Sequence, residues 1–288
     1  HPLGDNIRWL DAGEHPEKAV ESPYLHLFID HPGWGCHNIG EPGIDRRGIN
    51  AALNALYVLA LRAQADILDA CDMKGSERLR SLADTTAAAA THAFWNEKEQ
   101  AFVDGLRNGE QLRQISQQTN VWCIRAGFAD RGRRENALRR ILRPDPTMAC
   151  CGPYFYSYLL PLLAEFGMHS EALDLIRKGW GRMLDQEATT LWETFAGDEL
   201  DSLCHPWSGA PLDFLLRHAA GIGPLPAGQS VVALHPRPDL METMDARVET
   251  LQGTVRISWQ RNRDDVDLRG ELPENVTGIL DLPNGAQC

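Results

Sequence analysis

The chain has 288 residues, a formal net charge of −12 at pH 7, 43% hydrophobic residues and 24% charged residues. These values are ordinary for a globular protein with a sizeable core, and the length predicts one large domain or two unequal ones. The negative charge argues against a protein that binds nucleic acid independently of sequence, because such proteins need a surface rich in Lys and Arg.

Membrane, disulfide and metal-binding patterns are not evident in the sequence. It has no run of 18 or more apolar residues and does not open on a secretory signal, which argues against membrane insertion. Its seven cysteines lack any C-x-x-C pair, so they fit neither a zinc site nor a regular disulfide framework. Reduced, mostly buried thiols are expected, and they favour a cytoplasmic location. Because the first residue is His1 rather than Met, we expect a cleaved or truncated chain.

The first part of the chain changes from loop-like to helical at Arg46. Residues 1–45 are rich in Pro, Gly and His, whereas apolar residues after them recur at the spacing of an amphipathic helix. Pro211 lies in the first turn of the last such segment and Gly221 lies just beyond its end, as is usual for helix ends. About seven helices, stacked as antiparallel hairpins, are therefore expected over residues 46–72, 76–96, 115–129, 133–143, 153–167, 169–184 and 210–220.

The periodicity changes after Gly221. Residues 223–228 are rich in Gly and Pro and are interpreted as a linker. In residues 254–260, Val, Ile and Trp alternate with polar residues, which is typical of a half-buried strand, and Gln252–Gly253 marks a hairpin turn. A small C-terminal β-sandwich is expected. Its other short strands are predicted at residues 231–234, 247–251, 266–268, 276 and 279–282.

One loop between two predicted helices gathers four side chains of chemical interest within sixteen residues: Trp192, Glu193, His205 and Trp207. Tryptophan rings can pack on the C–H face of a pyranose while a carboxylate binds hydroxyls or activates water. Two interpretations of the loop remain open, a general-base site for glycoside hydrolysis and a buried Trp pair with a structural acid. His205 either orients the acid or binds a substrate hydroxyl, or it is a core histidine bonded to a backbone carbonyl.

A second acid–aromatic loop surrounds Asp30. This residue either accepts hydrogen bonds from two sugar hydroxyls or is a turn or cap aspartate. Asp30, His31 and His37 superficially suggest a metal site, but no helix aligns them, and no metal is predicted. Glu41 and Asp45 precede the first long helix, where acids stabilise the N-terminus, so both are interpreted as capping residues.

Other catalytic motifs are absent from the sequence. It contains no G-x-G-x-x-G fingerprint, P-loop, G-x-S-x-G elbow or Cys–His nucleophile pattern. Nucleotide and acyl-transfer chemistry are therefore unsupported, and no cofactor is predicted. Tyr154, Tyr156 and Tyr158 open one predicted helix at a spacing of two, which is not a helix face, so at least one ring is expected to point away from the core.

Seven segments follow one another in the order Phe28–Asp30, Gln118–Thr119, Gly152–Phe155, Gly179–Leu184, Ala188–Glu193, Cys204–Ser208 and Gly221–Pro224. From about Asp30 to Leu282, the chain thereby resembles bacterial α-L-rhamnosidases of glycoside hydrolase family 78. The most specific part is Thr-Thr-x-Trp-Glu followed by Cys-His-x-Trp-Ser. The resemblance implies a mainly α fold, a partial (α/α)6 toroid of helix hairpins followed by a small C-terminal β-sandwich. The predicted domains are residues 1–223 and 224–288.

The resemblance also implies a function, the inverting hydrolysis of terminal α-L-rhamnosides with Glu193 as the general base. It implies that Asp30 and His205 bind the rhamnose ring. Aromatic side chains are expected to shape the pocket, and the candidates are Trp34, Trp192, Trp207 and Tyr154. The family has Asp-Trp where this chain has Asp30–His31, so Trp34 is expected to replace that ring. The expected partner is a carbohydrate, without nucleic acid, membrane, metal or cofactor.

The general acid of this reaction has no obvious residue in the chain. In the family it lies in an acid- and arginine-rich motif upstream of the Asp-Trp loop, and nothing before Asp30 resembles that motif. An inverting enzyme needs the acid roughly 6.5–9.5 Å from the base. Only Glu41 and Asp45 are candidates, and both are interpreted as caps. Because a full toroid also needs more helices than the chain has, we expect the C-terminal part of a longer enzyme.

Three alternatives remain open from the sequence. The chain is either a non-catalytic carbohydrate-binding remnant that lacks the acid, a glycosidase of the same toroid fold that acts on another sugar, or a helical-hairpin interaction protein without a sugar site. The last alternative predicts that Asp30, Glu193 and His205 are scattered over the fold.

Overall fold

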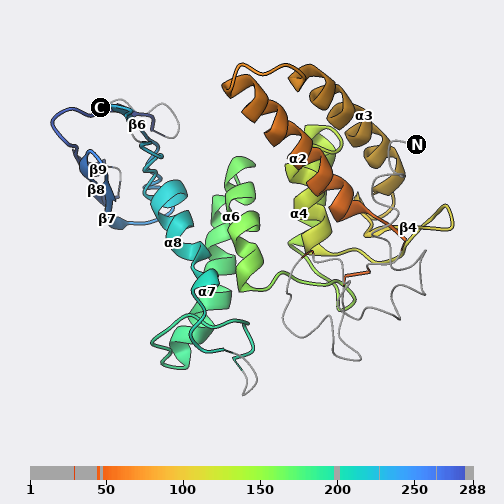
Figure 1. The fold of residues 1–288 in the computed structure, drawn as a ribbon. Coiled ribbons are helices and arrows are strands. Elements are labelled where there is room, and N and C mark those ends of the chain that lie inside the picture. The colour runs from red at the N-terminus through yellow and green to blue at the C-terminus, as the bar shows by residue number, and fades with distance from the viewer. Residues whose placement is uncertain are drawn as a thin grey trace. The chain divides into compact units, whose positions relative to one another are not determined.

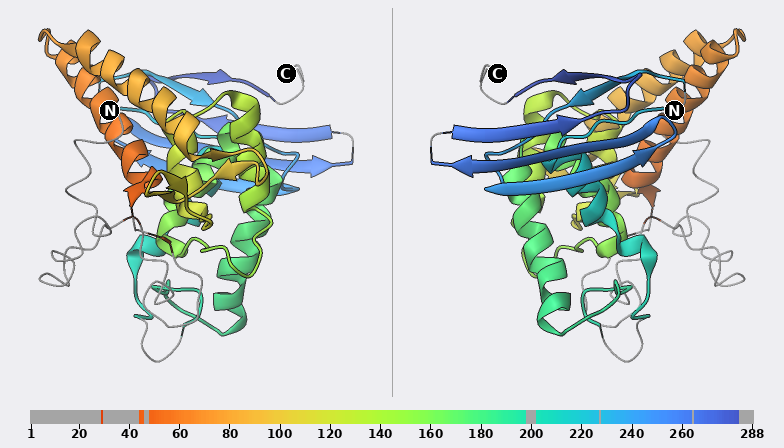
Figure 2. Two further views of the ribbon diagram at one scale, coloured as in Figure 1. Left: turned by 90° about the vertical axis from the view of Figure 1, so that its right-hand side faces the viewer. Right: turned by 90° about the vertical axis from the view of Figure 1, so that its left-hand side faces the viewer.

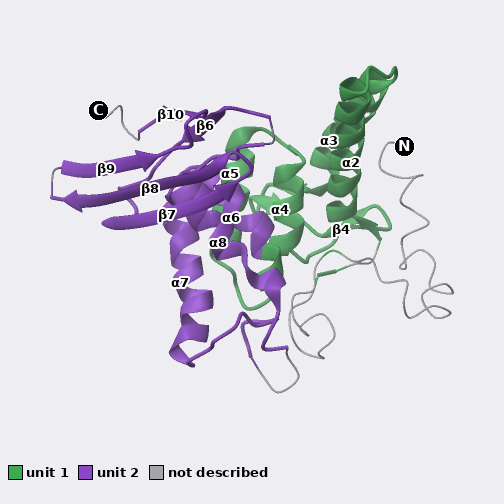
Figure 3. Cartoon of the chain, turned by 60° about the vertical axis from the view of Figure 1, so that its left-hand side comes forward, with its two compact units in different colours: residues 1–155 green, residues 156–288 purple. Residues whose placement is uncertain are grey.

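The computed structural model describes residues 29, 44–45, 48–197, 202–226, 228–263 and 265–282. The chain divides into two compact units, residues 1–155 and residues 156–288 (Figure 3). Among the described residues, helices dominate as far as residue 219 and strands follow from residue 231 (Figure 1). The predicted order, a mainly helical region followed by a small β domain, is therefore confirmed. The predicted boundary between residues 223 and 224 stays a prediction.

Unit 1 is built mainly from two helix pairs. Its described helices are α2 (Ala51–Ala70), α3 (Ser76–Phe94), α4 (Gln117–Arg125) and α5 (Arg131–Ile141), followed by the 3₁₀ turn η3 (Pro153–Phe155). Its strands are β1 (Ile49–Asn50), β2 (Trp95–Asn96), β3 (Ala101–Phe102), β4 (Gly105–Arg107) and β5 (Glu110–Gln111). The helices agree with the prediction. These strands were not predicted, because two or three residues are too few to show the alternation of a strand.

Helices α2 and α3 form a hairpin in unit 1 (Figure 1). Asn50 caps α2, since its side chain accepts a hydrogen bond of 3.0 Å from the Leu53 N–H. Alanines dominate the buried face of α2 and recur on that of α3, which lets the two backbones approach closely. With a mean hydropathy of 1.2, α2 is long and apolar enough to cross a membrane. Buried core helices meet the same criterion.

A fully buried carboxyl group, that of Asp104, ties the strands of unit 1 to its helices. Its Oδ1 accepts a hydrogen bond of 2.6 Å from the Ser116 hydroxyl, and its Oδ2 accepts one of 2.8 Å from the Asp45 N–H. Burial raises the pKa of Asp104 to about 7, although these hydrogen bonds oppose the rise. The interpretation of Asp45 as a cap of the first long helix is wrong, because α2 begins at Ala51 and Asn50 caps it.

Unit 2 begins with helices and ends with strands. Its described helical segments are α6 (Tyr156–Glu165), α7 (His169–Asp185), the 3₁₀ turn η4 (Pro206–Ser208), α8 (Ala210–Phe214) and the π-helical turn η5 (Leu215–Ala219). Its strands are β6 (Val231–Leu234), β7 (Thr243–Thr250), β8 (Gly253–Asn262), β9 (Asp265–Glu271) and β10 (Thr277–Leu280). Both α7 and α8 pack against α6.

The strands of unit 2 form two small sheets. β7, β8 and β9 form an antiparallel meander, and β6 pairs in parallel with β10 (Figure 2). Val255, Ile257 and Trp259 of β8 are buried in alternation with more exposed neighbours, as predicted. They join one apolar core with Val232 and Leu234 of β6. The β7–β8 hairpin turns just before Gly253, at the predicted position.

The end of the helical segment belongs to the same core as the sheets. Ala220 and Ile222 are buried against the strands. Arg237, between β6 and β7, donates its backbone N–H to the Ala219 carbonyl at 3.0 Å. Its guanidinium lies 2.8 Å from Nδ1 of His169, the first residue of α7. Helices and sheets of unit 2 are therefore joined by both apolar and polar contacts.

The cysteines depart from the expectation of mostly buried thiols. Among the described cysteines, Cys123 and Cys151 are buried, whereas Cys71, Cys150 and Cys204 are exposed. The expectation is therefore wrong for these three. In the part of the chain that the structure describes, no three His, Cys, Asp or Glu side chains gather into a group that could hold a metal ion.

Asp104→Asn tests the cost of burying the carboxyl group. Because its pKa is raised from 3.8 to about 7, the folded state keeps a proton that the unfolded chain has already lost, so stability falls as the pH rises through this range. The variant lacks this titration. Its free energy of unfolding relative to wild type should rise by roughly 2 kcal/mol between pH 5 and pH 8, as measured by urea unfolding.

Asp130→Asn is the matched control for this measurement. Asp130 caps α5, and the backbone N–H of Arg133 lowers its pKa. Its contribution to stability is therefore present at neutral pH and lost only in acid, below the pH range of the Asp104 effect. Equal pH dependence of the two variants between pH 5 and pH 8 would contradict the buried-carboxyl argument.

Candidate active site

The loop between α7 and α8 contains two arms, residues 188–197 and residues 202–208, which backbone hydrogen bonds join. The Glu193 N–H donates to the Ser202 carbonyl at 2.8 Å, and the His205 N–H donates to the Leu191 carbonyl at 2.7 Å. These bonds cross-link the arms, so the Trp-Glu motif and the His-x-Trp-Ser motif lie side by side. The loop thereby brings together side chains that the sequence places up to sixteen residues apart.

The carboxylate of Glu193 and the ring of His205 meet in this loop. His205 Nδ1 lies 3.8 Å from Glu193 Oε2, which is longer than a hydrogen bond. The Ser202 N–H donates to the same Oε2 at 3.0 Å. The Glu193 side chain is 17% exposed and that of His205 is 28% exposed. One carboxylate oxygen is thus held by the backbone, and no hydrogen bond from the described residues reaches Oε1.

The two tryptophans of the loop have different positions. Trp207 is half-buried, and its ring lies beside that of His205, with the centroids 4.2 Å apart and the planes tilted by 42°. Trp192 is buried, and its ring packs against Gly197 so closely that a Cβ there would lie 2.3 Å from it. Gly197 also has a φ of +63°, which favours glycine. The geometry suits Trp207 to contact a ligand and Trp192 to support the loop.

An aromatic cluster lies beneath the loop. Tyr156, Trp180 and Phe195 meet edge to face, with centroids 5.0–5.4 Å apart. The Trp180 Nε1–H donates to the Ser208 carbonyl at 2.9 Å, so the cluster also reaches the His-x-Trp-Ser arm. Sequence reasoning did not select Trp180 and Ser208 as functional residues. Both belong to the segments that carry the family resemblance, and that was the signal available.

Of the remaining predicted site residues, the structure describes Tyr154 alone. Asp30 and Trp34 lie outside the described residues, as do His31, His37 and Glu41. Tyr154 lies in η3 of unit 1 with its ring half-buried. It is less buried than Tyr156, and the expectation that one of the tyrosine rings points away from the core stays a prediction. The structure thus brings together Glu193, His205 and Trp207, and the roles of all predicted site residues stay predictions.

Two cavities border the candidate loop. One, of about 380 Å³, is lined by the Trp207 ring together with Ser157, Pro161, Pro206, Gly209, Ala210 and Asp213. The other, of about 320 Å³, is lined by Trp180, Met183, Leu184, Leu191 and residues 188–190. An aromatic ring, a hydroxyl and a carboxylate at the first cavity are groups that can contact a sugar.

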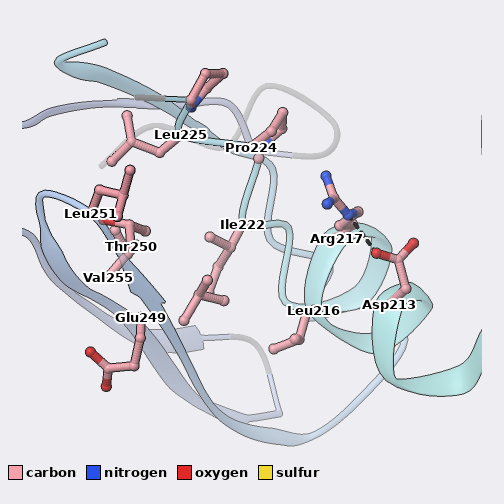
Figure 4. A pocket seen from close by; sticks show the side chains of 13 residues that line it. Asp213, Leu216, Arg217, Ile222, Pro224, Leu225, Glu249, Thr250, Leu251 and Val255 are labelled. Atoms are coloured by element: carbon pink, nitrogen blue, oxygen red, sulfur yellow. Dashed lines mark hydrogen bonds and ion pairs between the residues drawn. The ribbon is translucent and has the colours of Figure 1, made fainter. Parts of the chain in front are cut away.

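A cavity of about 590 Å³ lies elsewhere in unit 2 (Figure 4). Its walls are mostly aliphatic and come from η5, the linker after it and the β7–β8 hairpin, as the labelled side chains of Leu216, Ile222 and Leu251 show. Asp213 and Arg217 form an ion pair of 2.5 Å at its rim. None of the predicted site residues that the structure describes lines this cavity.

Models of two known protein domains match nearly the whole chain. Residues 8–219 match the model of the bacterial alpha-L-rhamnosidase 6 hairpin glycosidase domain, and residues 221–287 match that of the bacterial alpha-L-rhamnosidase C-terminal domain. The class of the fold is thus a six-hairpin glycosidase domain followed by a small β domain. The chain belongs to the bacterial α-L-rhamnosidase family, which confirms the resemblance seen in the sequence.

Solved structures show the same fold. The family 78 rhamnosidase of Bacillus sp. GL1 is similar with a TM-score of 0.75 and 28% identity, over 86% of this chain and 28% of that chain. An α-L-rhamnosidase of Streptomyces avermitilis, solved in complex with L-rhamnose, is similar with a TM-score of 0.63 and 21% identity, over 79% of this chain and 22% of that chain.

Curated relatives are also α-L-rhamnosidases. One from Formosa agariphila is 28% identical over 141 residues, which are 43% of this chain and 15% of the relative. One from Streptomyces avermitilis is 30% identical over 140 residues, which are 43% of this chain and 14% of the relative. The chain therefore spans only about 15% of the length of the curated relatives that it matches.

Gly179→Ala and Gly181→Ala, both within α7, test the packing beneath the loop. Alanine in a helix interior is favoured over glycine by about 0.5–1 kcal/mol. A Cβ at Gly181 meets no atom within 4 Å, so this variant should gain stability. A Cβ at Gly179 would lie 2.6 Å from the Phe195 ring, which Trp180 and Tyr156 hold in place, so this variant should lose about 1–3 kcal/mol.

Thermal unfolding of the two variants measures the difference. The midpoint should rise for Gly181→Ala and fall for Gly179→Ala. Shifts in the same direction would show that Phe195 is not confined as the structure indicates.

Proposed function

We propose that the protein is an inverting glycoside hydrolase that cleaves terminal α-L-rhamnosides, with Glu193 as its general base. The observation that carries the proposal is a half-buried carboxylate, oriented by the Ser202 N–H, with His205 3.8 Å from it. The Trp207 ring beside His205 offers an apolar surface for a sugar. Membership of the family and the names of the relatives support rhamnose as the sugar.

In this mechanism a water molecule bound at Glu193 Oε1 gives a proton to the carboxylate. Its oxygen forms a bond to the anomeric carbon while the glycosidic C–O bond breaks on the opposite face, so the configuration is inverted. The leaving oxygen takes a proton from a general acid roughly 6.5–9.5 Å from the base. We propose that this acid belongs to a part of the protein outside the described residues.

The remaining side chains of the loop bind the sugar in this proposal. His205 is close enough to Glu193 to contact a hydroxyl of the same ring, and Trp207 packs on its C–H face. Asp30 and Trp34 are proposed to complete the site, on the strength of the sequence resemblance alone. Trp192 contributes from within the loop, because its ring is buried.

Glu193→Gln in the whole protein tests the assignment of the base. The amide keeps the shape of the side chain and an oxygen that accepts from the Ser202 N–H, but it cannot take a proton from water. Turnover of an aryl α-L-rhamnoside should fall by about 10²–10⁴-fold with little change in the unfolding midpoint. Near-wild-type turnover in this variant would sink the assignment.

Two further measurements separate the proposal from its rivals. NMR of the first product should show the anomer of inverted configuration, and retention would contradict the mechanism. Calorimetry with L-rhamnose, next to the hydrolysis assay, identifies a carbohydrate-binding remnant if the wild-type protein binds the sugar without any turnover of the rhamnoside.

A further inference from the structure

The peptide group that joins Trp192 to Glu193 is held at both of its ends. Its carbonyl, that of Trp192, accepts a hydrogen bond from the Ser208 hydroxyl. Its N–H, that of Glu193, donates to the Ser202 carbonyl at 2.8 Å. Because the C=O and N–H of a peptide group lie in one plane and point in opposite directions, these two bonds at its opposite edges fix its orientation. They thereby fix the direction in which the Glu193 side chain leaves the backbone.

Ser208 is itself held in a rigid setting. Its side chain is completely buried, and it ends the 3₁₀ turn η4, in which its N–H donates to the His205 carbonyl at 3.2 Å. Its carbonyl accepts a hydrogen bond of 2.9 Å from the Trp180 indole. Trp180 belongs to α7 and is wedged between Tyr156 and Phe195. A continuous set of contacts therefore runs from a helix, through Ser208, to the backbone of the proposed base.

We infer that Ser208 is a positioning residue for Glu193, and that Trp180 acts through it. The inference rests on the proposed function of Glu193 as the general base. Without the Ser208 hydroxyl, the buried Trp192 carbonyl loses this donor, and the peptide group turns to find another. A base displaced by about 1 Å loses much of its effect on rate, because proton abstraction needs the water within hydrogen-bond reach.

Ser208→Ala in the whole protein is the direct test. The kcat for an aryl α-L-rhamnoside should fall by about 10- to 100-fold with KM nearly unchanged, since the groups proposed to bind the sugar are kept. A smaller loss in the same direction is expected for Trp180→Phe, which keeps the aromatic packing and removes only the N–H. The two losses should not add in the double variant, because both act through Ser208.

Azide distinguishes a misplaced base from a damaged fold. It attacks the anomeric carbon in place of water, forming a C–N bond as the glycosidic C–O bond breaks, and it has no proton for a base to remove. The leaving oxygen still takes its proton from the general acid. Azide should therefore restore turnover in Glu193→Ala, where the carboxylate that would repel this anion is gone, and yield the rhamnosyl azide of inverted configuration. Because Ser208 is inferred to act only through Glu193, adding Ser208→Ala to Glu193→Ala should leave the restored turnover unchanged.

Ser116→Ala is the matched control. Ser116 is also a fully buried serine, it caps α4, and its hydroxyl donates to Asp104 in unit 1. Loss of this hydroxyl should lower the unfolding midpoint, as loss of the Ser208 hydroxyl should, but leave kcat near that of wild type. The comparison separates the loss of a buried hydrogen bond as such from the loss of one that orients Glu193.

The outcomes are distinct. A Ser208→Ala protein that is less stable but keeps its kcat overturns the inference, as does an azide-restored turnover that is lower in the double variant Glu193→Ala, Ser208→Ala than in Glu193→Ala. Full activity in Glu193→Gln overturns the proposed function itself, whatever Ser208 does. If Ser208→Ala does not fold, Trp180→Phe decides the matter by the same split of kcat and KM and by the same comparison with azide in the Glu193→Ala background.

Discussion

The candidate site depends on how one peptide group, between Trp192 and Glu193, satisfies its hydrogen bonds. The arm that contains it is neither helix nor strand, so no ladder supplies partners for its buried backbone groups. Ser208 and Ser202, from the second arm of the same loop, supply them. The requirement that buried polar groups be paired thus brings the two arms together, and with them Glu193, His205 and Trp207.

Two carboxyl groups of the chain show what burial does to the same chemical group. Asp104 is completely buried, both of its oxygens accept hydrogen bonds, and burial raises its pKa to about 7. Glu193 is partly exposed and receives a hydrogen bond from the described residues at Oε2. The first arrangement ties backbone segments together. The second holds one oxygen in place and leaves the group partly accessible, as the proposed proton transfer from water requires.

The tryptophans in the segments that resemble the family also differ in burial. Trp180 and Trp192 are buried, and they pack against Phe195 and Gly197 respectively. Trp207 keeps part of its ring accessible beside His205. The aromatic richness of the loop is therefore mainly a consequence of its architecture. A long irregular loop needs its own apolar core to be held in one conformation, and these rings provide it.

Periodicity, turn residues and motifs predicted the helices, the strands of the β domain and the family, because all three are local properties of the chain. It led to Glu193, His205 and Trp207 through the motifs. The folded structure was needed to show that Trp192 is buried, that Asp45 bonds to Asp104 rather than capping α2, and that Ser208 holds the backbone of Glu193. Burial and hydrogen-bond partners depend on residues distant in sequence, which no local pattern specifies.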